Sequence, residues 1–144
     1  MTRPGLEPST SPGFLLWRTT LRWQRAIMAA LRPMGLTHVQ FVLLASTWWL
    51  TRVAGEKPTQ SRLAEHAATD PMMTSQVLRT LEAMGLITRS ASPDDGRARR
   101  LSVTKRGMAL AQQAIVVVEA VDNEFFATAG PRPTILRILH RLAG

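Results

Sequence analysis

The fold is decided between residues 59 and 104, where the chain has the sequence TQSRLAEHAATDPMMTSQVLRTLEAMGLITRSASPDDGRARRLSVT. Thr59 predicts the start of a short helix, because a threonine hydroxyl at the N-cap accepts a free backbone amide. Asp70 followed by Pro71 predicts the start of a second helix, since proline fits the first helical position without losing a needed donor. This helix should run to about residue 84, and Gly85 supplies the left-handed conformation that closes a helix. We expect two helices joined by a brief turn.

The second helix of this pair is amphipathic. Its apolar residues recur at intervals of four, four and three, at Met73, Val77, Leu81 and Met84. Polar residues occupy the other side, at Ser75, Gln76, Arg79 and Glu82. We therefore expect the apolar face to pack in the core and the polar face to be free to contact a partner.

A basic β-hairpin should follow the two helices. Residues 86–90 and 99–103 are short, partly alternating runs, and the turn-rich segment 91–98 separates them. A short helix, an amphipathic helix and a basic hairpin in this order make a winged helix-turn-helix. The second helix of such a unit fits the major groove of DNA, and arginines on the hairpin can contact phosphates or the minor groove.

Helices are expected on both sides of this unit. Residues 14–31 carry two adjoining apolar stripes, and Thr37 predicts the N-cap of a helix over residues 39–50. After the hairpin, Thr104 should cap a long helix that Gly130 ends, and Pro131 or Pro133 should open a last helix. The fold class is mainly α, formally α+β, with one small hairpin.

Charge and composition narrow the function classes. The 144 residues have a formal net charge of +8, which favours a polyanionic partner, although residues 1–55 hold six basic residues against one acidic one and lie outside the expected DNA-contacting unit. There is no cysteine and the three histidines are scattered, so we expect no metal site and no cofactor. No glycine-rich phosphate loop or catalytic set is present, and we expect no enzyme. No signal-peptide pattern or membrane span is evident, which predicts a cytoplasmic protein.

The segment 95–104, with the sequence DGRARRLSVT, resembles the wing of the MarR family of bacterial regulators. It is similar to the family's D-x-R-x-x-x-x-x-L-T pattern, with Val103 in place of the usual leucine. Residues 60–65 and 78–87 are similar to the family's third helix and to the end of its recognition helix. The three matches occur in the right order, and the resemblance covers the chain from about residue 15 to 142.

This resemblance implies a winged helix-turn-helix with N- and C-terminal dimerisation helices. It implies a homodimer that binds double-stranded DNA at a pseudo-palindromic operator and represses transcription. The corresponding divisions are a disordered lead-in over 1–13, a dimerisation helix over 14–35, the DNA-binding region over 36–104 and C-terminal dimerisation helices over 105–144. A homodimer would also explain the excess of apolar surface on the outer helices.

The resemblance also assigns roles to single residues. In the wing, Arg97 is expected to reach DNA and Asp95 to hold the tip in shape, although Asp95 has the alternative of an ordinary turn residue. The other candidate wing contacts are Arg89, Arg99 and Arg100, of which the last two must point to opposite faces of their strand. The candidates on the recognition helix are Met72, Thr74, Ser75, Gln76 and Arg79. Glutamine at 76, where the family often has arginine, can pair with adenine, whereas Arg79 has the alternative of an ion pair with Glu82.

Regulators of this type commonly hold a small aromatic or anionic effector beside the dimerisation helices. The four tryptophans suggest residues for such a pocket, and the candidates are Trp23, His38 and Trp48. The alternative is that the tryptophans fill the core and the dimer interface, with His38 at the surface.

The competing function is a winged-helix module that binds nucleic acid without sequence preference or acts through protein contacts. Polar residues on the free face of the second helix favour groove recognition, because a protein-binding face would carry exposed apolar residues. Met72 is the one apolar residue that favours the alternative.

Overall fold

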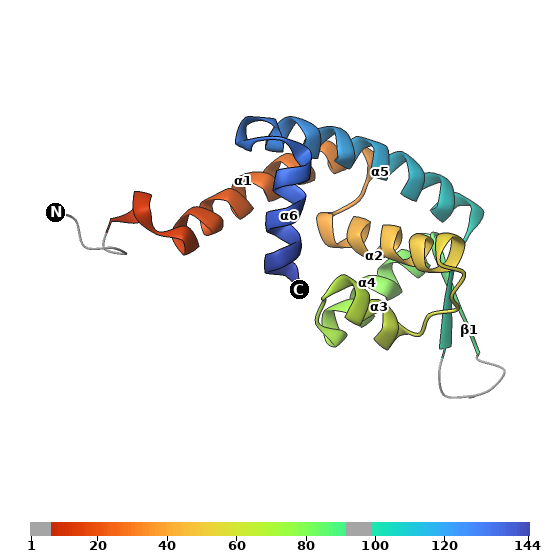
Figure 1. Cartoon of the computed structure of the whole chain (residues 1–144). Coiled ribbons are helices and arrows are strands. Elements are labelled where there is room, and N and C mark those ends of the chain that lie inside the picture. The colour runs from red at the N-terminus through yellow and green to blue at the C-terminus, as the bar shows by residue number, and fades with distance from the viewer. Residues whose placement is uncertain (1–6, 92–98) are drawn as a thin grey trace. The chain divides into compact units, whose positions relative to one another are not determined.

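The computed structural model describes residues 7–91 and 99–144, and Figure 1 shows the order of their elements. Contacts between residues divide the chain into two compact units. One unit consists of Leu31–Val117, and the other combines Met1–Ala30 with Val118–Gly144. Each unit is described by itself below.

The larger unit contains the expected helix-turn-helix and hairpin. Its elements are α2 (His38–Trp48), a π-helical turn (Trp49–Val53), α3 (Gln60–Ala67), α4 (Pro71–Ala83), β1 (Ile87–Ala91), β2 (Arg99–Val103) and the first half of α5 (Lys105–Phe126). The two strands pair antiparallel, from Ile87 opposite Val103 to Ala91 opposite Arg99. Leucines and alternate strand residues form its core, and the leucines with no exposed surface are Leu31, Leu43, Leu44, Leu50, Leu63, Leu78, Leu81 and Leu86.

The predicted helix ends of this unit are confirmed. Thr37 forms a capping box with Gln40, Thr59 accepts the amide of Arg62 at 3.2 Å, and Asp70 accepts the amide of Met73 at 2.9 Å. Gly85 has φ of 76°, the left-handed conformation that follows the end of α4. Local side-chain chemistry therefore sets where α2, α3 and α4 begin.

The start of α5 lies directly against the base of the hairpin. The Thr104 hydroxyl donates to the carbonyl of Gly85 at 2.7 Å and accepts the amide of Gly107 at 2.9 Å. A Cβ atom on Gly107 would overlap the carbonyl oxygen of Leu86 and lie 2.8 Å from its carbon. Only glycine fits this close approach, which fixes the wing against α5.

The smaller unit contains a 3₁₀ turn (Pro8–Thr10), all of α1 (Pro12–Leu31) except its last residue, the second half of α5, and α6 (Arg132–Ala143). A disordered lead-in through residue 13 was expected, but residues 8–10 form a turn and α1 begins at Pro12; residues 1–6 lie outside the described part. The Trp23 indole donates to Asp122 of α5 at 2.8 Å. This bond ties α1 to α5 within the unit.

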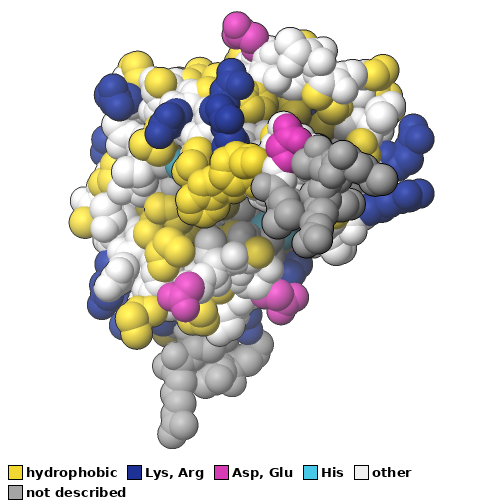
Figure 2. All heavy atoms as spheres, turned by 90° about the vertical axis from the view of Figure 1, so that its left-hand side faces the viewer, with side chains coloured by type: hydrophobic (Ala, Val, Ile, Leu, Met, Phe, Trp, Pro, Cys, Tyr) yellow, Lys and Arg dark blue, Asp and Glu magenta, His cyan; other side chains and the backbone are white. Residues whose placement is uncertain are grey.

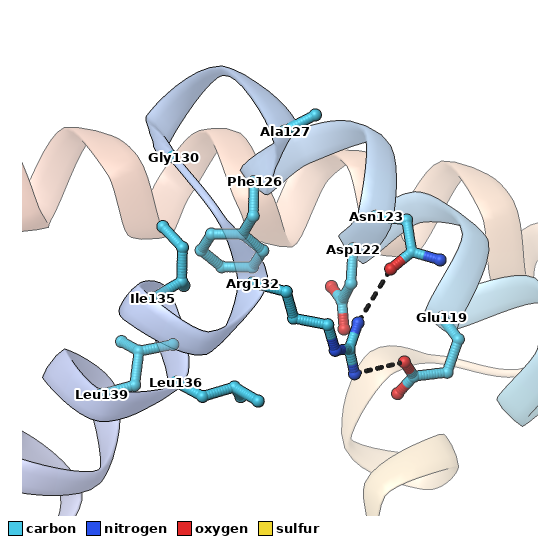
Figure 3. A pocket seen from close by; sticks show the side chains of 10 residues that line it. All are labelled: Glu119, Asp122, Asn123, Phe126, Ala127, Gly130, Arg132, Ile135, Leu136 and Leu139. Carbon is cyan, nitrogen blue, oxygen red and sulfur yellow. Dashed lines mark hydrogen bonds and ion pairs between the residues drawn. The ribbon is translucent and has the colours of Figure 1, made fainter.

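A pocket of about 240 Å³ lies where α5 ends and α6 begins (Figure 3). On its polar side, Arg132 donates to Asn123 at 2.8 Å and to Glu119 at 3.3 Å. Its other side is apolar and is formed by Phe126, Ile135, Leu136 and Leu139. The arginine thus joins the two helices across the mouth of an apolar hollow.

Many large apolar side chains of the smaller unit are exposed. On α1 these are Phe14, Leu15, Leu16, Trp17, Leu21 and Met28, and on α6 they are Leu136, Ile138, Leu139 and Leu142. Hydrophobic patches between arginine and lysine side chains are visible on the face in Figure 2. The apolar stripes expected on the first helix therefore exist, and much of their surface is not covered within one chain.

Candidate nucleic-acid interface

The packed face of α4 is rotated from the one that its sequence predicts. Thr74, Leu78 and Leu81 are the residues of α4 that have no exposed surface, whereas Met73 is 40% exposed. The apolar stripe predicted through Met73 was therefore placed about a quarter of a turn away from the real one. The reason is that a threonine, which counts as polar in the pattern, occupies the centre of the buried face.

Thr74 is a residue of the core, and its assignment to the DNA-contacting face is wrong. Its hydroxyl donates to the backbone carbonyl of Asp70 at 2.7 Å and lies 2.6 Å from the hydroxyl of Thr69, which therefore donates to it. Both the donor and the acceptor of this buried group are satisfied inside the helix-turn-helix. Ser75 lies at the edge of the buried face and is only partly exposed.

Met72, Gln76 and Arg79 form the exposed stripe of α4. A helix turns by about 100° per residue, so positions separated by four and three residues lie on one line. This line runs opposite Thr74, Leu78 and Leu81, and all three of its side chains are exposed. We call Met72, Gln76 and Arg79 the reading stripe.

Arg79 does not form the alternative ion pair with Glu82. The Glu82 carboxylate lies instead 3.7 Å from the Arg89 guanidinium. Within residues 7–91 and 99–144, no carboxylate pairs with Arg79. Its guanidinium keeps its five donors available for an external acceptor.

Arg89 acts as a brace inside the unit. Its side chain is only 15% exposed, and besides Glu82 it contacts the Gln60 amide oxygen at 3.4 Å. It thus joins β1 to both α3 and α4. A side chain held in this way supports the reading stripe, and the prediction that Arg89 contacts DNA gains no support from its position.

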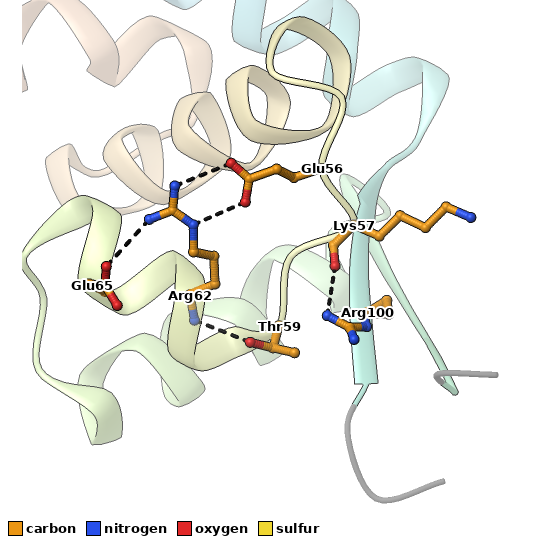
Figure 4. A network of polar contacts seen from close by, with 6 residues as sticks. All are labelled: Glu56, Lys57, Thr59, Arg62, Glu65 and Arg100. Atoms are coloured by element: carbon orange, nitrogen blue, oxygen red, sulfur yellow. Dashed lines mark hydrogen bonds and ion pairs between the residues drawn. The ribbon is translucent and has the colours of Figure 1, made fainter. Parts of the chain in front are cut away.

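Arg99 and Arg100 point to opposite faces of β2, as strand alternation requires. Arg99 is exposed, whereas Arg100 is partly buried and donates to the carbonyl of Lys57 at 3.0 Å (Figure 4). Arg99 is therefore the available cation of the described hairpin. Asp95 and Arg97 lie outside the described residues, so their predicted roles stay predictions.

A network that sequence analysis missed holds α3 in place (Figure 4). The Arg62 guanidinium makes a two-point contact with Glu56, at 3.0 and 3.2 Å, and lies 3.6 Å from Glu65. The hydrogen bond from Arg62 lowers the pKa of Glu56 and raises the pKa of Arg62 in return. The i,i+3 spacing of Arg62 and Glu65 was visible in the sequence, but nothing local pointed to Glu56.

The three residues predicted for an effector pocket divide between the two units. Trp23 belongs to the smaller unit, where its indole binds Asp122. His38 and Trp48 belong to the larger unit, and His38 is partly buried at the first position of α2. The indole nitrogen of Trp48 is buried without a hydrogen-bond partner in the described part of the chain. An unpaired buried donor costs free energy, and none of the pockets described here is lined by Trp48, so its role in an effector site stays a prediction.

The described residues, 7–91 and 99–144, contain neither a cluster of metal-ligating side chains nor a single helix that could span a membrane. No group of three or more His, Asp or Glu side chains there could hold a metal ion. No single helix there is long and apolar enough to cross a membrane, and only Pro12–Met34 taken together with His38–Val53 passes that test by length and composition.

Comparisons with known proteins agree with this geometry. The model of the MarR family matches residues 36–98. The chain is 46% identical over 135 residues to the uncharacterized HTH-type transcriptional regulator YdcH of Bacillus subtilis, covering 94% of this chain and 91% of the relative. It is 36% identical over 142 residues to the HTH-type transcriptional repressor Rv2887 of Mycobacterium tuberculosis, covering 96% of this chain and 97% of the relative.

Solved structures of this group have the same fold. The transcriptional repressor CouR bound to a 23-mer DNA duplex superposes with a TM-score of 0.84 and 26% identity, covering 100% of this chain and 99% of that one. The complex of Rv2887 with salicylic acid gives a TM-score of 0.67 at 34% identity, covering 92% of this chain and 96% of that one. The family model, the full-length relatives and the shared fold together show that this chain belongs to the MarR family of winged helix-turn-helix transcriptional regulators.

Proposed function

We propose that this protein is a homodimeric repressor whose two α4 helices bind successive major grooves of a pseudo-palindromic operator. The observation that carries the proposal is the reading stripe of Met72, Gln76 and Arg79. These side chains are exposed and form no side-chain hydrogen bond or ion pair with the described residues, on a helix that is capped and packed on its other side. Glutamine and arginine are the side chains that pair with adenine and guanine edges in the major groove. CouR, with the same fold, has been solved on a DNA duplex.

The uncovered apolar surface of the smaller unit supports dimerisation. Trp17 on α1 is 64% exposed and Leu142 on α6 is 73% exposed, within a larger set of apolar side chains on the same two helices. Contiguous apolar surface of this kind is rare on monomers and marks an interface. A two-fold dimer would cover it and would present two equivalent α4 helices to a two-fold symmetric site.

A small organic acid is the effector class that the chain's relatives favour. The Rv2887 repressor has been solved with salicylic acid and with p-aminosalicylic acid. In this chain the unpaired indole N–H of Trp48 can donate to such an acceptor. Binding of the ligand would release the operator, and the protein would act in the cytoplasm, where the DNA is.

Titration against a selected operator tests the proposal. Gln76→Ala should keep the dimer folded but change which base is preferred at one position of each half-site. Arg97→Ala should weaken binding to every sequence alike, because a wing arginine is expected to contact the backbone or the minor groove. Gln112→Ala, at an exposed position of α5 that has no part in the proposal, is the control for general effects on DNA binding at a fixed dimer concentration.

The competing function, nucleic-acid binding without sequence preference, makes the opposite prediction. A non-specific binder would lose affinity steeply with salt and show the same affinity for all duplexes. A specific repressor also loses affinity with salt, but keeps a preference for its own site of roughly a thousandfold or more. Equal binding of selected and scrambled duplexes at moderate salt would refute the proposed function.

A further inference from the structure

Met72 is the most exposed apolar side chain of α4, at 72% exposure. A single exposed methionine needs no explanation by itself. Its position does, because it lies in the first turn of α4, directly after Pro71 and beside the cap in which Asp70 accepts the amide of Met73. The backbone that carries Met72 is therefore fixed, while its side chain extends away from the protein.

The helix geometry puts Met72 on the same line as two base-pairing side chains. Gln76 follows one turn later and Arg79 two turns later, with rises along the axis of about 6 Å and then about 4.5 Å. Opposite them lie the buried residues Thr74 and Leu78. Any groove that Gln76 enters is therefore also entered by Met72, within the span of about two base pairs at 3.4 Å each.

The chemistry of the stripe selects the base that Met72 can recognise. Among the groups that the bases display in the major groove, the C5 methyl of thymine is apolar, whereas the others are hydrogen-bond donors and acceptors. Methionine has a flexible, polarisable and unbranched side chain without a strong donor or acceptor. We propose that Met72 contacts a thymine methyl group in each operator half-site, next to the base pair that Gln76 contacts.

This inference rests on the proposed function and specifies its substrate. The alternative occupant, an apolar protein partner, would need a wider apolar patch around Met72. The next residues of the stripe are instead Gln76 and Arg79, which are polar and exposed. The surroundings of Met72 thus match a base edge better than a protein surface.

The test replaces thymine by deoxyuridine, which removes the methyl group and leaves every hydrogen-bonding group unchanged. A duplex selected by the wild-type dimer is synthesised with deoxyuridine at each thymine position in turn, in both half-sites. Wild type, Met72→Ala and Met73→Ala are titrated against each duplex. Met73 is a matched control, because it is the same residue type in the same turn but about 100° away from the reading stripe.

For wild type we expect one symmetric pair of positions at which deoxyuridine weakens binding, by about fourfold for each methyl group lost. These positions should lie within about two base pairs of the base whose preference changes in Gln76→Ala. Met72→Ala should be insensitive to the change, while Met73→Ala should respond as wild type does. Wild type that is insensitive at every thymine, or Met72→Ala that is as sensitive as wild type, overturns the inference. If wild type selects no sequence at all, the proposed function fails and this inference fails with it.

Discussion

Gly107→Ala should destabilise the protein, although alanine is the better helix former. Inside a helix the exchange is worth about 0.8–1.0 kcal/mol in favour of alanine. At Gly107, however, the new methyl group would overlap the carbonyl oxygen of Leu86, a backbone group that cannot rotate away. Forcing atoms into a filled site costs typically about 1–3 kcal/mol. Because backbone must move here, we take a clash cost of about 3 kcal/mol and subtract the helix preference of alanine of about 1 kcal/mol. The free energy of unfolding should therefore fall by about 2 kcal/mol.

Thermal unfolding followed by circular dichroism measures this loss. For a chain of this size about 2 kcal/mol corresponds to a fall in Tm of about 4–8 °C, compared at one protein concentration since the dimer is coupled to folding. The matched control is Gly13→Ala in α1, where a new Cβ meets nothing within 4 Å. That variant should be as stable as wild type or more stable by up to about 1 kcal/mol. Equal or higher stability of Gly107→Ala would refute the close approach of α5 to the hairpin.

Two further substitutions test the supports of the reading stripe. Thr74→Val should lower the free energy of unfolding by about 1–2 kcal/mol, because it removes the acceptor for the hydroxyl of Thr69. It should leave the selected operator sequence unchanged, and a changed operator sequence would show that Thr74 contacts DNA after all. Glu56→Gln should be less stable than wild type near neutral pH, and Arg62→Ala, which removes the other member of the same ion pair, should be compared with it. Because the pKa of Glu56 is below its ordinary value of 4.5 in the folded state, the stability it contributes is present above that value and is lost as pH falls through the folded pKa. The difference between Glu56→Gln and wild type in urea unfolding should therefore shrink on acidification, and a difference that stays constant with pH would contradict the role of the pair.

Features with a local cause could be predicted from the sequence. The caps at Thr37, Thr59 and Asp70, and the left-handed Gly85, depend on residues within three positions of each other, and all four are confirmed. The bounds of the two strands, expected over 86–90 and 99–103, agree to within a residue with Ile87–Ala91 and Arg99–Val103. Local hydrogen bonds and backbone preferences act in the same way whatever the rest of the chain does.

Features with a distant cause could not be predicted. Arg89 and Arg100 were candidates for DNA contact, but their partners Gln60 and Lys57 lie 29 and 43 positions away in the sequence. Thr74 is a different case, because its partner Asp70 is only four positions away: periodicity counts a hydroxyl as polar, whereas a hydrogen bond to that carbonyl lets the side chain be buried. Polar side chains are thus placed by their partners rather than by their type.

The boundaries of the compact units differ from those that the sequence predicts, for a similar reason. The sequence puts a division at Thr104, where a cap ends the hairpin and a helix begins. The contacts instead divide the chain inside α5, between Val117 and Val118. A helix cap marks where secondary structure changes, but a compact unit ends where side chains stop sharing a core.

Selection of bound duplexes from a random library by the wild-type dimer tests the central claim most directly. We expect an inverted repeat whose half-site centres lie about 10 base pairs apart, as two α4 helices in successive major grooves require. Repeating the selection with Gln76→Ala should change the preferred base at one position of each half-site and keep the spacing. Enrichment of a sequence without two-fold symmetry, or of no sequence at all, would contradict a dimer that recognises its operator through the exposed stripe of α4.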